Sequence, residues 1–253
     1  MNRDTLRQSA NAASVLLALV VNVLSNALPL NGQNTGAISD RFDVYFVPAG
    51  YVFAIWGVLY IGWLAFVVYQ FMPAQRQNPR LRRLGYWFAL SGVLNAAWLF
   101  CWHWNQFGLS VLVMLALLGT LIMSYLRLNV GRSTVGRAEQ WCVDIPFGAY
   151  LGWISVATIA NVTSFLDFVE WNGAGIAPQA WAAIMLAVAT VLGLLLSWLR
   201  RDAAYVLVLA WAFAGIALKH AGVAVVSSAA WAATVIALVL AARNMLAPRR
   251  HPL

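Results

Sequence analysis

Long apolar stretches, separated by short polar connectors, run through the whole chain. We identify eight of them, at residues 11–30, 47–71, 84–103, 109–128, 143–165, 178–199, 203–219 and 223–242. The sixth stretch contains no charged residue at all. A helix needs about 20 mostly apolar residues to cross a bilayer, and lipid admits only segments that satisfy their own backbone hydrogen bonds. The pattern therefore predicts an all-α integral membrane protein, an eight-helix transmembrane bundle with no room for a separate soluble domain.

The composition agrees with this pattern and excludes several classes of protein. Of the 253 residues, 62% are hydrophobic and only 9% are charged, whereas a soluble chain carries about 25% charged residues. A soluble enzyme, a disordered tail and a nucleic-acid-binding domain are excluded together. The net charge of +8 suggests nucleic acid only until the positions of the charges are considered.

The basic residues indicate the direction of the spans. Fourteen of the 16 fall on one side of the predicted bundle: Arg3, Arg7, Arg76, Arg80, Arg82, Arg83, Arg127, Arg132, Arg137, Arg200, Arg201, Arg243, Arg249 and Arg250. Only Arg41 and Lys219 fall on the other side. Because cytoplasmic loops hold the excess of Lys and Arg, we predict eight spans with both termini in the cytoplasm, in the plasma membrane or, in a bacterium, the inner membrane.

The first span has a second interpretation. Arg3 and Arg7 precede a short apolar run that ends in Ser25-Asn26-Ala27, which is the arrangement of a cleavable signal peptide. The charge bias of the later loops does not depend on which interpretation holds.

Metal and disulfide chemistry have little support in the sequence. Cys101 and Cys142 are predicted at opposite ends of the bundle, too far apart for a disulfide. His103, His220 and His251 are scattered, so no metal site is expected. Asp144, shortly before Pro146, is interpreted as a helix-start residue. No buried carboxylate or histidine relay is evident, which argues against a proton-coupled pump.

Aromatic and amide residues recur at helical spacing in three spans. Residues on one face of each span are Phe53, Trp56, Tyr60 and Trp63 in the second, Ser91, Asn95, Trp98 and Trp102 in the third, and Trp153, Ala157 and Asn161 in the fifth. A neighbouring face of the fifth span carries Gly148 and Gly152, a GxxxG pair suited to close helix packing. The stripes are either plain bundle core or the walls of a cavity for a flat apolar ligand. An amide at bilayer depth needs partners and favours the cavity. Trp87, Trp104, Trp141 and Trp171 are expected to be interface anchors.

Three motifs in these spans resemble the TspO/MBR family (tryptophan-rich sensory protein/translocator protein). Residues 150–161, YLGWISVATIAN, are similar to the family's fifth-helix pattern Y-L-A-W-V-S-x-A-T-x-x-N. Residues 94–98, LNAAW, resemble L-N-x-x-W of the third helix. Residues 48–60 resemble the second-helix pattern P-P-x-W-V-x-x-P-V-W-x-x-L-Y in their final W-x-x-L-Y, but depart from it earlier, with Ala54 in place of Pro.

The resemblance covers about residues 11–166 and implies a five-helix ligand-binding bundle there, followed by three additional helices at 167–245. In the family, a pocket beneath the loop that joins the first two helices binds porphyrins and synthetic aromatic molecules. That loop would be 31–46. The resemblance, together with the stripes, gives the candidate ligand-binding residues Trp56, Tyr60, Asn95, Trp98, Trp153, Ala157 and Asn161. The family's sterol-recognition pattern is missing after Phe165-Leu166-Asp167, so sterol binding is not expected.

Three functions follow from this interpretation. The first is a membrane receptor or sensor for a planar apolar ligand, such as a porphyrin or haem-type tetrapyrrole. The second is a transporter of small apolar molecules, and the third is a Trp-dependent porphyrin-degrading enzyme, for which no conventional catalytic residues are found. The Ala-rich last two spans are expected to serve helix packing or a homodimer.

Overall fold

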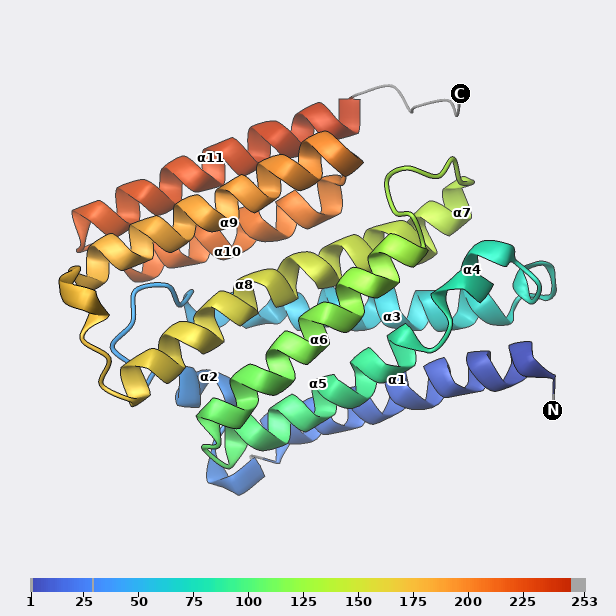
Figure 1. The fold of residues 1–253 in the computed structure, drawn as a ribbon, viewed down its shortest axis with the longest axis horizontal. Coiled ribbons are helices and arrows are strands. Elements are labelled where there is room, and N and C mark those ends of the chain that lie inside the picture. Colours follow the sequence, from blue (N-terminus) through green and yellow to red (C-terminus); the bar gives the residue numbers. More distant parts are fainter. Residues whose placement is uncertain (1, 29, 247–253) are drawn as a thin grey trace.

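The computed structural model describes residues 2–28 and 30–246, which form helices and connecting turns without a β-strand. The eight long helices are α1 (Arg3–Ala27), α3 (Ile55–Phe71), α5 (Trp87–His103), α6 (Phe107–Arg127), α8 (Ile145–Phe168), α9 (Pro178–Arg200), α10 (Ala203–Lys219) and α11 (Ala224–Leu246) (Figure 1). The short helices α2 (Thr35–Ser39), α4 (Pro79–Leu84) and α7 (Arg137–Glu139) lie in connectors. The all-helical fold class is confirmed.

Within residues 2–28 and 30–246, six helical segments are long and apolar enough to cross a membrane. They are Arg3–Ala27, Gly50–Phe71, Phe107–Arg127, Arg137–Phe168, Pro178–Arg200 and Ala224–Leu246. The helices α5 and α10 have 17 residues each, at the short end of the length that spans hydrocarbon. The chain is a multi-pass integral membrane protein, and crossing by all eight helices stays a prediction.

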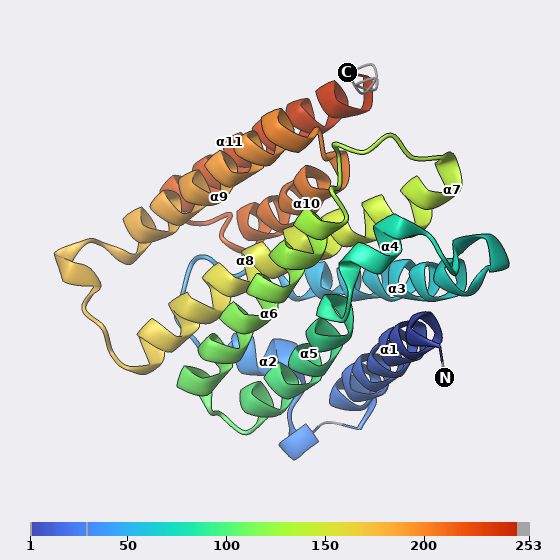
Figure 2. The same cartoon turned by 45° about the vertical axis from the view of Figure 1, so that its right-hand side comes forward.

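The helices form two groups that meet along α8 and α10. Figures 1 and 2 show α1, α3, α5, α6 and α8 on one side and α9, α10 and α11 on the other. The GxxxG pair of α8 makes the close approach. A Cβ at Gly148 would collide with the Asp202 carboxylate, and a Cβ at Gly152 would lie 2.9 Å from the Tyr205 carbonyl oxygen. The predicted packing role of the GxxxG pair is therefore confirmed, with α10 as the partner.

Several alanines of α10 and α11 are buried inside the second group, where the two helices pack against each other. Ala212 and Ala217 of α10 and Ala230 of α11 have no exposed surface, and Ala241 of α11 is 2% exposed. Small side chains let these two helices approach closely. Internal packing thus accounts for these buried alanines, and the homodimer stays a prediction.

Most arginines gather at one end of the bundle, which we call the arginine-rich end (residues 3–7, 72–86, 128–139 and 200–202). Side chains there join connectors that are distant in sequence: Arg7 donates to the Leu81 carbonyl oxygen at 2.8 Å, Arg82 donates to Asp4 at 3.0 Å and Arg200 donates to Asn129 at 3.1 Å. At the opposite end, Lys219 pairs with Asp40 at 2.6 Å and Arg41 donates to Asn105 at 2.5 Å. Arg249 and Arg250 lie outside the described residues.

Asp144 does not begin a helix, contrary to the sequence interpretation. A π-helical turn, Gln140–Asp144, connects α7 to α8, so the residue lies inside continuous helix and its side chain makes no cap hydrogen bond. The carboxylate instead pairs with Arg80, a buried residue that also donates to Glu139 at 2.8 Å and to the Leu128 carbonyl oxygen at 2.5 Å. The sequence indicated only that Arg80 lies in the connector after the second span, because hydropathy alone does not reveal its carboxylate partners.

Candidate ligand-binding site

Two adjacent hollows lie among the aromatic residues of α3, α5 and α8. The inner cavity has a volume of about 50 Å³ and lies between α3, α5, α6, α8 and the segment that joins α1 to α3. The outer cleft has a volume of about 860 Å³ and opens between α1, α3, α5 and the same segment. Both are lined by Thr35, Phe53, Trp56 and Trp98. The two hollows thus form one site with a narrow inner part and a wide outer part.

Six of the seven residues predicted from the sequence line this site. Those in the inner cavity are Trp56, Trp98, Trp153, Ala157 and Asn161. Tyr60 lines the outer cleft with Trp56 and Trp98. Asn95 lines neither hollow and has no exposed surface. The structure therefore brings together the aromatic stripes of three helices, whereas the predicted amide of Asn95 does not line the site.

The aromatic rings pack against one another and fill most of the inner cavity. Trp56 stacks on Tyr60 with ring centroids 5.9 Å apart, and it meets Trp153 edge-on at 6.1 Å. Phe53 meets Trp153 edge-on at 5.9 Å. A volume of 50 Å³ holds a water molecule but no drug-sized ligand, which needs about 300–1,000 Å³. The outer cleft, which Trp56 and Tyr60 line, has the volume that the inner cavity lacks.

The two predicted amides connect helices within the bundle. Asn161 accepts a hydrogen bond from the Trp98 indole at 3.0 Å and donates to the Ser110 hydroxyl at 2.9 Å, which links α8 to α5 and α6. The Asn95 side-chain oxygen accepts from Asn22 of α1 at 2.7 Å. Asn22, which lines the outer cleft, was missed from the sequence, although an amide in the middle of an apolar span was a signal that could have identified it.

Four buried polar groups near the aromatic residues have no hydrogen-bond partner among the described residues. They are Trp63 Nε1, Asn95 Nδ2, the Tyr150 hydroxyl and Trp153 Nε1. Each of these residues is at most 3% exposed, and the rings of Trp63 and Tyr150 lie 4.8 Å apart. An unpaired buried donor costs about 1–3 kcal/mol. Asn95 and Tyr150 are near enough to pair with each other, so the indole N–H groups of Trp63 and Trp153 are the donors that favour an acceptor, supplied by water or a ligand, in this part of the bundle.

The segment that covers the site is attached to α5 through His103. The His103 imidazole lies 3.0 Å from the Leu30 carbonyl oxygen through Nδ1 and 3.1 Å from the Thr35 hydroxyl through Nε2. A carbonyl can only accept, so Nδ1 carries a proton, while Nε2 pairs with the Thr35 hydroxyl. The Trp102 indole also donates to the Thr35 carbonyl oxygen, at 3.3 Å. His103 was not predicted as a site-forming residue, because its partners lie in a segment distant in sequence.

The other side of the covering segment is attached to α10. The backbone N–H of Ala49 donates to the Gly215 carbonyl oxygen at 3.2 Å, and the Trp211 indole donates to the Val52 carbonyl oxygen at 3.0 Å. A Cβ at Gly215 would collide with Val52. Nearby, the ring of Tyr45 meets His220 edge-on at 5.2 Å. Burial lowers the pKa of His220 below its usual value, and the neighbouring charge of Lys219 acts in the same direction.

The charged and sulfur-containing residues form neither a disulfide nor a metal-binding cluster within the part of the chain that the structure describes. Cys101 and Cys142 are free thiols. No group of three or more His, Cys, Asp or Glu side chains in residues 2–28 and 30–246 is arranged to hold a metal ion. The chemistry of the site is therefore that of aromatic surfaces, indole N–H donors and amides.

Comparison with known proteins identifies one family. The family model described as TSPO-like protein matches residues 8–243. The match extends past residue 166 and takes in α9, α10 and most of α11 as well as the first five long helices. No curated protein and no solved structure matches the chain.

Proposed function

The chain belongs to the TSPO-like protein family, and from this premise we propose that it is a membrane receptor or sensor for a planar apolar ligand of the porphyrin or tetrapyrrole class. The observation that carries the proposal is the position of Trp56, which lines both hollows and contacts Tyr60 and Trp153. A ring in this position offers its surface to a flat molecule in the outer cleft.

The size and chemistry of the outer cleft suit such a ligand. Its volume of about 860 Å³ lies within the range of small-molecule sites. Stacking adds about 0.5–1.5 kcal/mol for each aromatic pair beyond the area buried, and four aromatic side chains line the cleft: Phe53, Trp56, Tyr60 and Trp98. The amides of Asn22 and Asn26 also line it and can orient polar groups at the edge of a tetrapyrrole.

Replacing Trp56 with Leu is expected to weaken porphyrin binding by about tenfold, since one stacked partner worth about 1.4 kcal/mol is lost. The measurement is a titration of the detergent-solubilised protein with a porphyrin, followed by quenching of tryptophan fluorescence. The matched control is Trp231→Leu, because Trp231 lies on α11 and is 44% exposed. Equal dissociation constants for the two variants would place the ligand elsewhere.

We propose further that the arginine-rich end faces the cytoplasm. The basis is the positive-inside rule, together with the contacts that bring residues 3–7, 72–86, 128–139 and 200–202 to the same end. The described part of the opposite end carries Arg41 and Lys219, each with an acidic or amide partner.

Single cysteines at the two ends test this orientation. In a background with Cys101→Ser and Cys142→Ser, Gly222→Cys is expected to react with a membrane-impermeant maleimide on intact cells. Arg76→Cys is expected to react only after lysis. Gly222 has open space around its Cβ direction and Arg76 is exposed, so both thiols are reachable. The reverse labelling pattern would put the arginine-rich end outside.

A further inference from the structure

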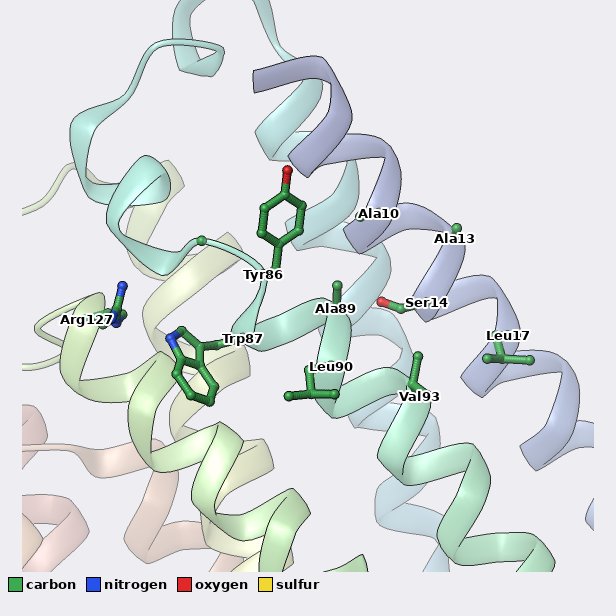
Figure 3. Close-up of a pocket in the computed structure, with 11 residues that line it drawn as sticks. Ala10, Ala13, Ser14, Leu17, Tyr86, Trp87, Ala89, Leu90, Val93 and Arg127 are labelled. Carbon is green, nitrogen blue, oxygen red and sulfur yellow. The ribbon is translucent and has the colours of Figure 1, made fainter. Parts of the chain in front are cut away.

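A third hollow lies on the outer surface of the bundle, away from the aromatic site. It has a volume of about 790 Å³ and covers the first half of α5, between α1 and the end of α6 (Figure 3). None of its lining residues belongs to the inner cavity or the outer cleft. Figure 3 shows Ala10, Ser14 and Leu17 of α1 on one side and Trp87 with Arg127 on the other.

Small side chains create this hollow. Where α1 and α5 cross, Gly92 allows Ser14 to approach so closely that a Cβ at Gly92 would lie 2.9 Å from the Ser14 Cβ. From there to the arginine-rich end, Ala10 and Ala89 line the hollow and leave the space that longer side chains would fill.

The walls of the hollow are apolar and face outward. Leu17, Leu90 and Val93 are 42%, 44% and 48% exposed. These side chains lie on spans of a membrane protein, so the material in contact with them is hydrocarbon. The shape and the walls together fit an acyl chain that lies along α5.

The end of the hollow nearest the connectors carries positive charge. The Arg127 guanidinium lies 5.8 Å from the Trp87 ring centroid and donates to the Arg83 carbonyl oxygen at 3.4 Å. Arg82 and Arg83 are also exposed here. The nearby carboxylate of Asp4 already accepts from Arg82 at 3.0 Å. Tyr86, 49% exposed, also lines the hollow. This arrangement suits a phosphate group at the membrane surface.

We propose that the hollow is a binding site for an anionic phospholipid, with an acyl chain against Leu17, Leu90 and Val93 and the phosphate near Arg127. Charge complementarity selects this occupant over a second copy of the chain. Two copies that met here in the same orientation would bring their Arg127 and Arg83 groups together at one depth, and like charges across an interface are strongly unfavourable.

Native mass spectrometry of the full chain in detergent tests the proposal. The probes are phosphatidylglycerol and phosphatidylcholine with identical acyl chains. Phosphatidylglycerol is expected to be retained more strongly, and Arg127→Gln is expected to weaken its binding about fivefold, the factor that corresponds to about 1 kcal/mol for each basic residue near a membrane surface. Arg76→Gln, which removes an exposed charge at the same end of the chain, is the matched control and is expected to change nothing.

A second pair of variants tests the apolar part. Ala89→Leu fills the hollow and is expected to weaken retention of both lipids, whereas Ala232→Leu, on the exposed side of α11, is expected to leave it unchanged. Near-UV circular dichroism confirms that each variant is folded. Equal retention of the two lipids, or equal effects of Arg127→Gln and Arg76→Gln, would overturn the proposal. A dimer that disappears in Ala89→Leu would assign the hollow to a second copy instead.

Discussion

Replacing Arg80 with Met is expected to destabilise the folded protein by about 3–5 kcal/mol, the usual cost of removing one partner from a buried ion pair. Arg80 is 6% exposed and pairs with both Glu139 and Asp144. Without its guanidinium, two carboxylates are left close together at the junction of α7 and α8. The measurement is equilibrium unfolding in detergent micelles, with Arg76→Met as the matched control because Arg76 is exposed.

A double variant separates charge from packing in this cluster. Arg80→Met together with Asp144→Asn removes one of the carboxylates left unpaired, so part of the lost free energy of unfolding is expected to return. If Arg80→Met alone unfolds like Arg76→Met, the ion pairs contribute nothing to stability and the cluster has another role.

Replacing Gly148 with Val is expected to separate α10 from α8 and to cost several kcal/mol. The new side chain would occupy the position of the Asp202 carboxylate. That carboxylate accepts from the Tyr125 hydroxyl at 2.9 Å and caps α10 through the Tyr205 backbone N–H at 3.0 Å. Overpacking costs about 1–3 kcal/mol, and each buried group left unpaired costs a similar amount.

The readout for Gly148→Val is equilibrium unfolding together with the rate of proteolysis in the connector between α8 and α9. Gly119→Val is the matched control, because a Cβ at Gly119 meets nothing within 4 Å. Equal behaviour of the two glycine variants would show that the contact between α8 and α10 tolerates a branched side chain.

The helices were predictable because apolar length is a strong signal, but their ends were not. The sequence placed the first span at residue 11, whereas α1 begins at Arg3. Asp4 and Arg7 extend the helix because their polar groups find partners, on Arg82 and on the Leu81 carbonyl oxygen. Hydropathy indicates which residues lie within the hydrocarbon, whereas a helix ends where its backbone and side-chain hydrogen bonds end. The two boundaries differ wherever a connector folds back on the bundle and supplies polar partners.

The candidate site was predictable in part for a similar reason. Helical spacing placed Trp56, Trp98 and Trp153 on faces that meet. The spacing of residues within one helix carries no information about which residue of another helix they contact. The hydrogen bond between Asn22 and Asn95, which are 73 positions apart, could therefore not be predicted. The same holds for the hydrogen bond between Trp211 and Val52, which are 159 positions apart. This bond joins the last three helices to the segment that covers the site.

The two-sided burial of α8 has a consequence for the synthesis of the protein. In the segment Arg137–Phe168, 67% of the most apolar stretch is buried, against 28–39% in the other five candidate spans. One face of α8 meets the aromatic site and another, with Gly148 and Gly152, meets α10. A ribosome adds about 5–20 residues per second, so α10 is complete roughly 3–10 seconds after α8 has been made. During that interval the glycine face of α8 has only lipid, or a chaperone of the insertion machinery, to cover it.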